Sequence, residues 1–266
     1  MVQFDVDLFV IGGGSGGVRA ARMAAQRGAR VALAEQAGTA GLGGTCVNVG
    51  CIPKKLYSYA AHYGESFEES HGFGWRGAAP QLDWEVLKAN RRREIERLNG
   101  VYRQLLVGAG VQVVNAHARL TGPQAVWADG REWRARHILV ATGGQPQQLE
   151  VPGAEHACVS DAMFDLPQFP KRLLVVGGGY IACEFASIFR GLGAAVTQCH
   201  RGTQVLRGFD DEVRDFLAAE MRKKDVDLVL GSQVAAIRPT TDGLQVDLAI
   251  DGPPQPARTV DVVLFA

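Results

Sequence analysis

The hydrophobic pattern of the chain begins with a short apolar run, residues 8–11, followed by GGGSGG at 12–17. A segment rich in small residues continues to Gly28, and a second apolar run occupies 31–34. A short apolar run bounded by glycine indicates a buried strand, and a longer segment after a glycine turn indicates a helix packed on it. The region therefore predicts a strand, a glycine turn, a helix and a second strand.

The same order recurs in the second half of the chain. An apolar run, a glycine turn, a helical segment and another apolar run lie at 173–176, 177–179, 180–192 and 195–199. Two such βαβ units predict an α/β fold with two Rossmann-like dinucleotide-binding domains. We place the first domain at 1–150 and the second at 151–266.

The intervening residues predict mainly helix. Residues 47–69 and 82–107 have helical patterns, and 138–141 read as a buried strand that completes the first domain. The last apolar run, 260–266, predicts a strand at an exposed sheet edge, which would be prone to aggregation without a partner.

Charge and composition exclude several classes of function. Lys plus Arg equal Asp plus Glu at 28 each, so no charge excess points to nucleic acid or a membrane surface. No apolar stretch is long enough to span a bilayer, and the first residues lack the basic start of a signal peptide. With five cysteines in a chain that needs no covalent staples, we expect a reducing cytoplasm, where any disulfide is catalytic.

The first glycine turn has the spacing of a dinucleotide-binding site. Gly12, Gly14 and Gly17 follow the G-x-G-x-x-G pattern, in which glycine allows the turn, the approach of a pyrophosphate and close helix packing. Glu35 ends the second strand, where a ribose-binding carboxylate belongs. The alternative is a tight turn followed by a surface glutamate.

The second turn repeats this spacing with Gly177, Gly179 and Ala182. No carboxylate ends its second strand; His200 stands there, with Arg201 and Arg207 after it. Guanidinium groups bind a 2′-phosphate that a carboxylate would repel, so this pattern favours NADPH over NADH. The alternative is two solvated surface arginines.

The most specific signal is the run GGTCVNVGCIPKK at 43–55, which carries Cys46 and Cys51. Two cysteines at this spacing lie on adjacent turns if the helix is distorted between them. The other three cysteines are scattered and typical of buried apolar positions, and no second Cys or His pair gives metal-ligand spacing, so we expect no metal site. A dithiol can be reduced by a flavin and then attack an external disulfide, helped by a helix N-terminus and by cations such as Lys54.

In order and spacing, GGGSGG, GGTCVNVGCIPKK and GGGYIACEFA resemble the pyridine nucleotide–disulfide oxidoreductase family. The resemblance implies FAD and NADPH as cofactors. It also implies that Cys46 meets the substrate while Cys51 lies against the flavin as the charge-transfer thiol. Further implied roles are a Lys54–Glu184 pair near the flavin, Tyr180 covering its nicotinamide side, and flavin or phosphate contacts from Thr45, Thr142 and Gly143.

Within the family, the sequence is most similar to glutathione reductases. Ser15 and Arg22 match glutathione contacts, Tyr102 matches a substrate-channel tyrosine, and Arg201 and Arg207 match the NADPH-phosphate site. The resemblance thus implies electron flow from NADPH through FAD and the dithiol to glutathione disulfide. Taken alone, Arg22 could be a helix-surface charge and Tyr102 ordinary packing.

The resemblance is incomplete at the C-terminal side. Family members carry a further domain that forms a homodimer and contributes a His–Glu pair, and none of the six histidines here lies in such a motif. We therefore expect a homodimer for the full-length family member and reduced turnover for this chain. Two alternatives stay open: an FAD- and NADPH-binding module with little reductase activity, and a reductase of another disulfide.

Overall fold

The computed structural model describes residues 3–78, 80–147, 149–250 and 256–266. Contacts divide the chain into two compact units, the first formed by Met1–Pro53 with Ala89–Gln145 and the second by Lys54–Lys88 with Pro146–Ala266. In the ranges the structure describes, no helix is both long and apolar enough to cross a membrane. The assignment of one nucleotide-binding domain to 1–150 and another to 151–266 stays a prediction.

The first unit contains a six-stranded sheet in the order β3-β2-β1-β6-β5-β4. Its strands are β1 (Val6–Ile11), β2 (Val31–Ala34), β3 (Gln112–Val114), β4 (Arg119–Gly122), β5 (Ala125–Ala128) and β6 (Arg131–Val140). Parallel pairing joins β3, β2, β1 and β6, whereas β4, β5 and β6 form an antiparallel ribbon. The predicted first βαβ unit is therefore present. The strand predicted at 138–141 is the end of the longer β6, which stops at Val140, but the expectation that it is buried is wrong: Ile138 and Leu139 are half-buried and Val140 is exposed.

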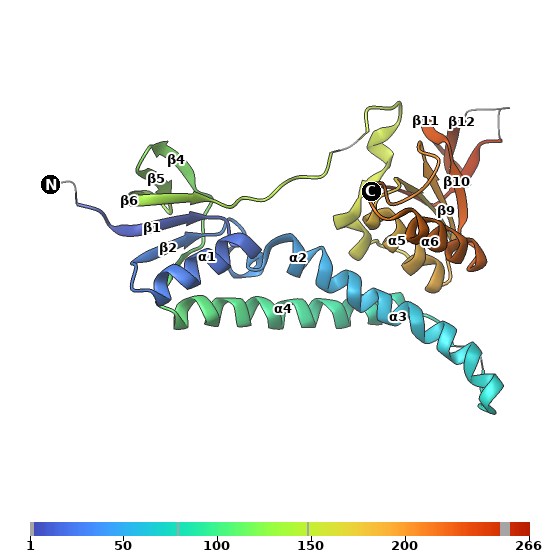
Figure 1. The fold of residues 1–266 in the computed structure, drawn as a ribbon, viewed down its shortest axis with the longest axis horizontal. Helices are drawn as coiled ribbons and strands as arrows, with labels where there is room; N and C mark the ends of the chain where they lie inside the picture. Colours follow the sequence, from blue (N-terminus) through green and yellow to red (C-terminus); the bar gives the residue numbers. More distant parts are fainter. Residues whose placement is uncertain (1–2, 79, 148, 251–255) are drawn as a thin grey trace. The chain divides into compact units, whose positions relative to one another are not determined.

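Helices cover one face of this sheet. They are α1 (Ser15–Gln26) and α4 (Trp84–Gly108), and Figure 1 shows both beside β1 and β2. Val10 and Leu33 of the sheet pack with Val18 of α1 and Leu106 of α4 in one apolar cluster. On the other face, Phe9 meets Trp133 of the antiparallel ribbon edge-to-face at 5.5 Å between ring centroids. Because β1 is covered on both faces, it reads in sequence as a continuous apolar run rather than an alternating one.

The second unit contains a five-stranded sheet in the order β10-β9-β8-β14-β7, and its described pairings are all parallel. The strands are β7 (Cys158–Val159), β8 (Arg172–Val176), β9 (Ala195–His200), β10 (Asp227–Leu230) and β14 (Val262–Phe265). The helices α5 (Tyr180–Gly191) and α6 (Asp211–Lys223) connect β8 to β9 and precede β10. The second predicted βαβ unit is therefore present as well.

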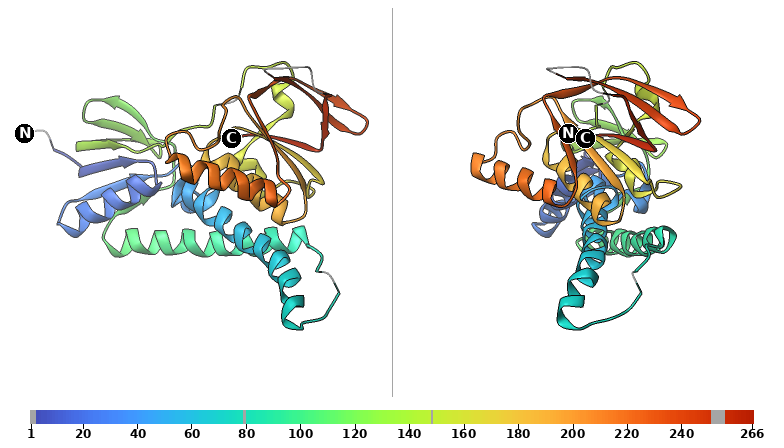
Figure 2. Two further views of the ribbon diagram at one scale, coloured as in Figure 1. Left: turned by 45° about the vertical axis from the view of Figure 1, so that its right-hand side comes forward. Right: turned by 90° about the vertical axis from the view of Figure 1, so that its right-hand side faces the viewer.

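An antiparallel sheet packs on this parallel one. It is formed by β11 (Ser232–Thr240), β12 (Gly243–Ile250) and β13 (Arg258–Val260), which lie in the orange-red to dark red part of the ribbon in Figure 2, as does β14. Val234, Ile237 and Val246 from this sheet share a buried cluster with Leu174 and Val263 from the parallel one. The cluster is the core between the two sheets.

The expectation that residues 260–266 form an exposed sheet edge is wrong. Strand β14 lies inside the parallel sheet, paired with β8 on one side and β7 on the other. Leu264 and Phe265 stand opposite Cys158 and Val159 of β7, a strand of two residues. Such a short strand gives no periodic signal in sequence, so the partner that covers β14 could not be seen there.

The helix α3 (Cys51–Ser70) and the start of α4 supply residues 54–88 to the second unit. Tyr57 is fully buried and donates to the carbonyl of Phe164 at 2.8 Å, and Trp84 Nε1 donates to the carbonyl of Leu166 at 2.9 Å. Both rings join an aromatic cluster with Phe164, Phe169, Phe185 and Phe189. Each such ring pair contributes roughly 0.5–1.5 kcal/mol beyond its buried area, so the cluster fastens this segment to α5.

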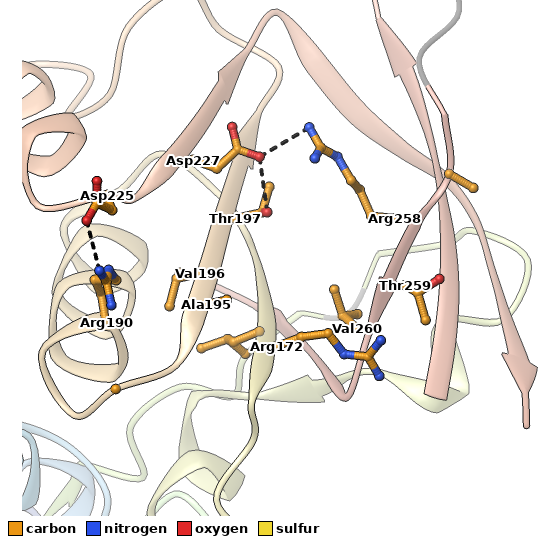
Figure 3. A pocket seen from close by; sticks show the side chains of 13 residues that line it. Arg172, Arg190, Ala195, Val196, Thr197, Asp225, Asp227, Arg258, Thr259 and Val260 are labelled. Atoms are coloured by element: carbon orange, nitrogen blue, oxygen red, sulfur yellow. Dashed lines mark hydrogen bonds and ion pairs between the residues drawn. The ribbon is translucent and has the colours of Figure 1, made fainter. Parts of the chain in front are cut away.

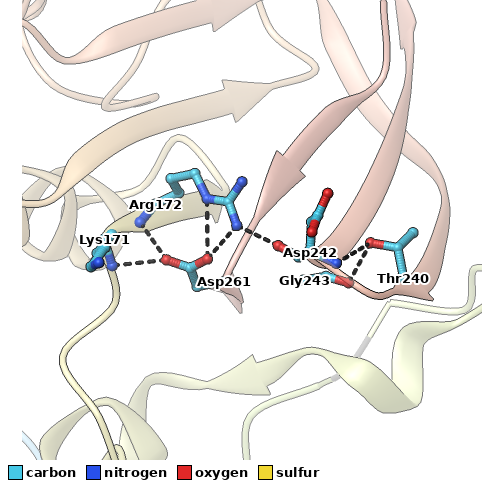
Figure 4. Close-up of polar contacts among 6 residues, drawn as sticks. All are labelled: Lys171, Arg172, Thr240, Asp242, Gly243 and Asp261. Atoms are coloured by element: carbon cyan, nitrogen blue, oxygen red, sulfur yellow. Dashed lines mark hydrogen bonds and ion pairs between the residues drawn. The ribbon is translucent and has the colours of Figure 1, made fainter.

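A charged pair ties the two sheets of the second unit together (Figure 4). The Asp261 carboxylate accepts from the backbone N–H groups of Lys171 and Arg172, both at 2.8 Å. It also accepts from the Arg172 guanidinium at 3.1 Å and 2.6 Å, and that guanidinium donates to the carbonyl of Asp242 in the β11–β12 turn. Partial burial raises the pKa of Asp261, but the hydrogen bonds and charge of Arg172 outweigh this and lower it below the ordinary 3.8.

We predict that Asp261→Asn destabilises the second unit. Hydrogen bonds to a charged group are worth about 1.5–3 kcal/mol, and partial exposure places the cost near the lower figure. Since the folded pKa of Asp261 is lowered, its contribution is complete above about pH 4 and is lost as the pH falls further. Thermal unfolding from pH 7 to pH 3 should show the gap between wild type and variant closing at the acidic end. The control is Asp242→Asn, because Arg172 binds the backbone carbonyl of Asp242 and the exposed carboxylate is changed without touching that bond. Equal melting temperatures of the two variants at pH 7 would contradict the prediction.

Candidate functional site

The first glycine turn is built so that side chains cannot enter it. Gly12 has φ +107°, and a Cβ there would lie 2.3 Å from the carbonyl oxygen of Ala141. A Cβ on Gly17 would lie 1.9 Å from the carbonyl oxygen of Gly12, so α1 meets the turn closely. Helix α1 begins at Ser15 after Gly14 with no side-chain cap. Its first N–H groups are thus left for an anion, which fits the pyrophosphate of a dinucleotide.

Glu35 reaches this turn from the end of β2. Its carboxylate accepts from the N–H of Gly13 at 2.8 Å and from the N–H of Ala37 at 3.2 Å. These bonds hold the half-buried carboxylate beside the turn, where a ribose attached to the pyrophosphate would lie. The turn and Glu35, predicted from spacing, are therefore together in the structure.

The residues just before Cys46 run along the same turn. The N–H of Gly43 donates to the carbonyl of Gly13 at 2.8 Å, and Gly43 also forms a β-bridge with Gly14. A Cβ on Gly44 would lie 2.7 Å from the Cα of Gly14, so only glycine permits this approach. The short helix α2 (Gly44–Asn48) begins there and carries Cys46. The cysteine-bearing segment therefore starts against the first glycine turn.

The helix is broken between the two cysteines, so the helical pattern expected over 47–69 is interrupted, and the distortion that the spacing required for adjacent turns is present. Helix α2 ends at Asn48 and α3 begins at Cys51. In one continuous helix, side chains five residues apart would point about 140° away from each other. The break changes the directions of the two side chains. Gly50 makes the break possible because it packs against α2, and a Cβ on Gly50 would lie 2.7 Å from the carbonyl oxygen of Thr45. Cys46 is half-buried and Cys51 exposed; the disulfide between them stays a prediction.

Other predicted contacts of the first nucleotide gather at this turn. Ala141 N donates to the carbonyl of Ile11 at 2.8 Å, which brings the end of β6 against Gly12. The next two residues, Thr142 and Gly143, are exposed there, as is Ser15 at the start of α1. Thr45 is exposed on the first turn of α2. Their contacts with a cofactor stay predictions.

Of the three predicted substrate residues, all on helices, Arg22 has the most informative surroundings. In the part of the chain that the structure describes, its Nε is shielded from solvent and has no hydrogen-bond partner. An orphaned guanidinium N–H retains a donor for an anionic ligand. Tyr102 instead packs, half-buried, on the apolar cluster of α1, α4 and the sheet, which suits the packing interpretation as well as the channel one.

An amide network that sequence reasoning missed supports the cysteine segment. Asn99 of α4 is 4% exposed and donates to the carbonyl of Leu42 at 2.8 Å and to Asn48 Oδ1 at 2.9 Å. Asn48 in turn donates to the carbonyl of Gly44 at 2.9 Å. The position of Asn48 between the two cysteines was a hint, but nothing in the pattern of α4 distinguished Asn99.

The second glycine turn, in the second unit, has comparable geometry. A Cβ on Gly177 would lie 1.8 Å from the carbonyl oxygen of Ala266, and Ala182 is fully buried. Helix α5 begins at Tyr180 after Gly179 without a side-chain cap. The N–H groups at its start are left for a phosphate, which fits a second dinucleotide.

The segment that follows β9 folds back onto this turn. Leu206 N donates to the carbonyl of Gly178 at 2.6 Å, which brings the exposed Arg201 and Arg207 to the same edge of the sheet. The ring of His200 lies directly against Gly178, where a Cβ would meet it at 2.4 Å. Burial lowers the pKa of His200 below 6.5, and Arg201 lowers it further, so the imidazole is neutral at pH 7. The positive charge at this edge thus comes from the two arginines.

Three further predicted residues lie on α5 or bind to it. Lys54 Nζ donates to Glu184 Oε1 at 2.6 Å, the pair that the resemblance implied. Both side chains are partly exposed, so water screens their attraction. Tyr180 is 60% exposed at the start of the helix. Their catalytic roles stay predictions.

A cavity of about 560 Å³ lies at the opposite edge of the parallel sheet, at the amino-terminal ends of β8 and β9 (Figure 3). Its charged side chains are already paired: Arg190 with Asp225 at 2.9 Å, Arg258 with Asp227 at 3.1 Å, and Arg172 with Asp261 outside the lining at 2.6 Å. In parallel sheets of this type, nucleotides bind at the carboxyl ends of the strands. We therefore separate this cavity from the glycine turn.

Comparison with known families gives one match over nearly the whole chain. The family model described as "Pyridine nucleotide-disulphide oxidoreductase" matches residues 6–266. The glutathione reductase of Burkholderia cepacia is 50% identical over 266 residues, which cover 100% of this chain and 58% of that protein. A glutathione reductase of a Nostoc species is 40% identical, with 100% and 57% covered. The "Thioredoxin reductase SEP1" of Emiliania huxleyi is 39% identical, with 89% and 50% covered.

Solved structures agree with the fold. A "Cu(II) complex of HOCl-induced flavoprotein disulfide reductase RclA from Escherichia coli" superposes with a TM-score of 0.82 at 27% identity, covering 97% of this chain and 55% of that one. The sequence thus spans little more than half the length of these relatives.

Proposed function

Because the chain belongs to the pyridine nucleotide-disulphide oxidoreductase family, we propose that it serves the NADPH-dependent reduction of glutathione disulfide. In this proposal the first unit binds FAD, the second binds NADPH, and Cys46 and Cys51 are the redox couple. A cytoplasmic location, and a homodimer for the longer proteins of the family, stay predictions.

The observation that carries the proposal is the contact between the first glycine turn and the residues before Cys46. Gly43 bonds to Gly13, and Gly44 touches Gly14, so a dithiol begins where a dinucleotide would lie. A structural cysteine has no need of this placement, whereas a dithiol that exchanges electrons with a bound flavin does. When bound, FAD would supply a two-electron relay between NADPH and the dithiol.

The cysteines then act by thiol–disulfide exchange. The Cys46 thiolate attacks one sulfur of glutathione disulfide, forms a mixed disulfide and releases the first glutathione as thiolate. The released glutathione thiolate takes the proton of the Cys51 thiol, and the Cys51 thiolate attacks the sulfur of Cys46. This closes the Cys46–Cys51 disulfide and releases the second glutathione as a thiolate, which takes a proton from water. The two electrons lost by the dithiol equal the two gained by the substrate. Arg22, with its unsatisfied Nε, is the residue proposed to bind a substrate carboxylate, together with Ser15.

The names of the relatives differ in their disulfide substrate, so the substrate of this chain is a matter for experiment. Two of them are glutathione reductases and a third is called a thioredoxin reductase. The test is to load the full chain with FAD and follow NADPH consumption with glutathione disulfide, with oxidised thioredoxin, and with neither. Consumption that requires glutathione disulfide supports the proposal. Consumption with thioredoxin alone would assign another disulfide, and a flavin-loaded protein inactive with every disulfide would favour a binding module.

We predict that Arg201 and Arg207 select NADPH. Alanine at either position removes a charge-assisted contact worth about 1.5–3 kcal/mol, which should raise the KM for NADPH roughly 10–100-fold. The KM for NADH should stay nearly constant, because NADH has no 2′-phosphate. Steady-state kinetics with both nucleotides measures the ratio. Arg222→Ala on α6, which removes an exposed arginine of the same unit, is the control, and a parallel rise in both KM values would refute the assignment.

A further inference from the structure

The dithiol segment is held by two side-chain amides whose role goes beyond packing. Asn99 projects from α4 and is almost fully buried. Its Nδ2 donates to the carbonyl of Leu42 at 2.8 Å and to Asn48 Oδ1 at 2.9 Å, so the bonds engage both of its N–H donors. Asn99 therefore links α4 to the residues on each side of Cys46.

Asn48 extends this link along α2. Its Nδ2 lies 2.9 Å from the carbonyl of Gly44, the first residue of the helix, and 3.3 Å from the carbonyl of Gly41. The side chain at the end of α2 is thus bonded to the start of the same helix and to the loop before it. Cys46 lies inside the segment closed by these bonds, and Cys51 lies three residues after the segment ends at Asn48.

A helix of this kind cannot hold its own geometry. Helix α2 has five residues, far fewer than the roughly 12–15 that an isolated helix needs to persist in water. Its position must therefore be imposed from outside, and Asn99 supplies a fixed support because α4 has 25 residues and packs on the core. An apolar residue at 99 would leave Asn48 Oδ1 without this donor and the carbonyl of Leu42 with only the longer bond from Asn48 Nδ2 at 3.5 Å.

We propose that Asn99 is a positioning residue for the redox couple, acting through Asn48 to hold Cys46 at the distance from Cys51 at which their disulfide closes. The inference rests on the proposed role of these two cysteines. Two thiols held near each other form a disulfide more readily, since less conformational freedom is lost on closure. Loosening the segment therefore favours the dithiol over the disulfide.

The expected effect is a shift in a balanced exchange. The Cys46–Cys51 disulfide and two glutathione thiols give the protein dithiol and one glutathione disulfide, with two electrons and two protons passing to the protein. Asn99→Leu should move the equilibrium constant about tenfold toward the dithiol, which equals about 30 mV for a two-electron couple.

The test equilibrates the full, FAD-loaded chain in glutathione buffers of graded ratio, quenches with acid and quantifies alkylated Cys46 and Cys51 by peptide mass spectrometry. Asn90→Leu is the matched control, since Asn90 is exposed on the same helix. A tenfold shift in Asn99→Leu and none in Asn90→Leu supports the proposal. Asn48→Ala should shift the constant in the same direction, and the double variant should add little, because both residues act in one network.

Other results would overturn it. A lowered melting temperature of Asn99→Leu with an unchanged equilibrium constant shows a merely structural asparagine. If Asn99→Leu does not fold, the half-buried Asn48→Ala decides alone, and an unchanged constant there refutes the inference. The measurement needs no turnover. If the wild type reduces glutathione disulfide and the variants have the wild-type equilibrium constant, only this inference is refuted. If the wild type never closes the Cys46–Cys51 disulfide, the proposed function is refuted as well.

Discussion

Serine at position 46 or 51 is expected to abolish NADPH-dependent reduction of glutathione disulfide while FAD stays bound. Each replacement removes one of the two sulfurs between which electrons must pass, and oxygen cannot take part in thiol–disulfide exchange. Loss of a nucleophile from a catalytic unit typically costs a factor on the order of 10⁴–10⁶ in rate. The measurement is NADPH consumption by flavin-loaded variants at equal protein concentration.

The matched control is another cysteine of the same chain. Cys158 is half-buried beside Met163, and burial raises its pKa to about 11, so it stays a thiol at neutral pH and cannot act as the nucleophile. Cys158→Ala should therefore keep the wild-type rate. Retention of activity in both serine variants, or its loss in Cys158→Ala with flavin still bound, would show that Cys46 and Cys51 are not the redox couple.

The features of the fold that sequence revealed are those that local chemistry dictates. Each apolar run of the two βαβ units has a glycine within three residues of it, and the helices after both turns follow within a few residues. The break between Cys46 and Cys51 also has a local cause. A side chain at position 50 would block the close contact with the Thr45 carbonyl, and Gly50 has none. Such features depend on residues close in the chain, which a pattern can show.

The features that sequence did not reveal depend on residues far apart. Nothing in the two-residue strand β7 marks it as the partner of β14, so the run at 260–266 was placed at an edge. Asn99 lies 51 residues from Asn48, and its bond depends on how α4 packs against the sheet. The contact of Gly43 and Gly44 with the first turn likewise arises from tertiary packing, although it decides where the dithiol lies.

The same turn gives a second test with a large expected effect. Gly16 and Gly17 are neighbours in α1, yet a Cβ at Gly17 would lie 1.9 Å from the carbonyl oxygen of Gly12, whereas a Cβ at Gly16 meets nothing within 4 Å. In Gly17→Ala the helix must therefore move away from the turn that is proposed to bind the pyrophosphate. Overpacking of this kind costs about 1–3 kcal/mol, equivalent to a loss of roughly 10–100-fold in FAD affinity if the turn is displaced.

Gly16→Ala makes the same chemical change one residue away. Because the Gly16 N–H also belongs to the proposed pyrophosphate site, the control is Gly100→Ala in α4, where a Cβ likewise meets nothing within 4 Å. Gly100→Ala removes a helix glycine away from the turn, which should stabilise the unit by about 0.5–1 kcal/mol and leave FAD affinity unchanged. Fluorescence titration with FAD, together with thermal unfolding of each variant, measures both effects. Equal FAD affinity in Gly17→Ala and Gly100→Ala would mean that the flavin does not rest on this turn. The placement of the dithiol beside the turn would then no longer support the electron path from NADPH to Cys46 and Cys51.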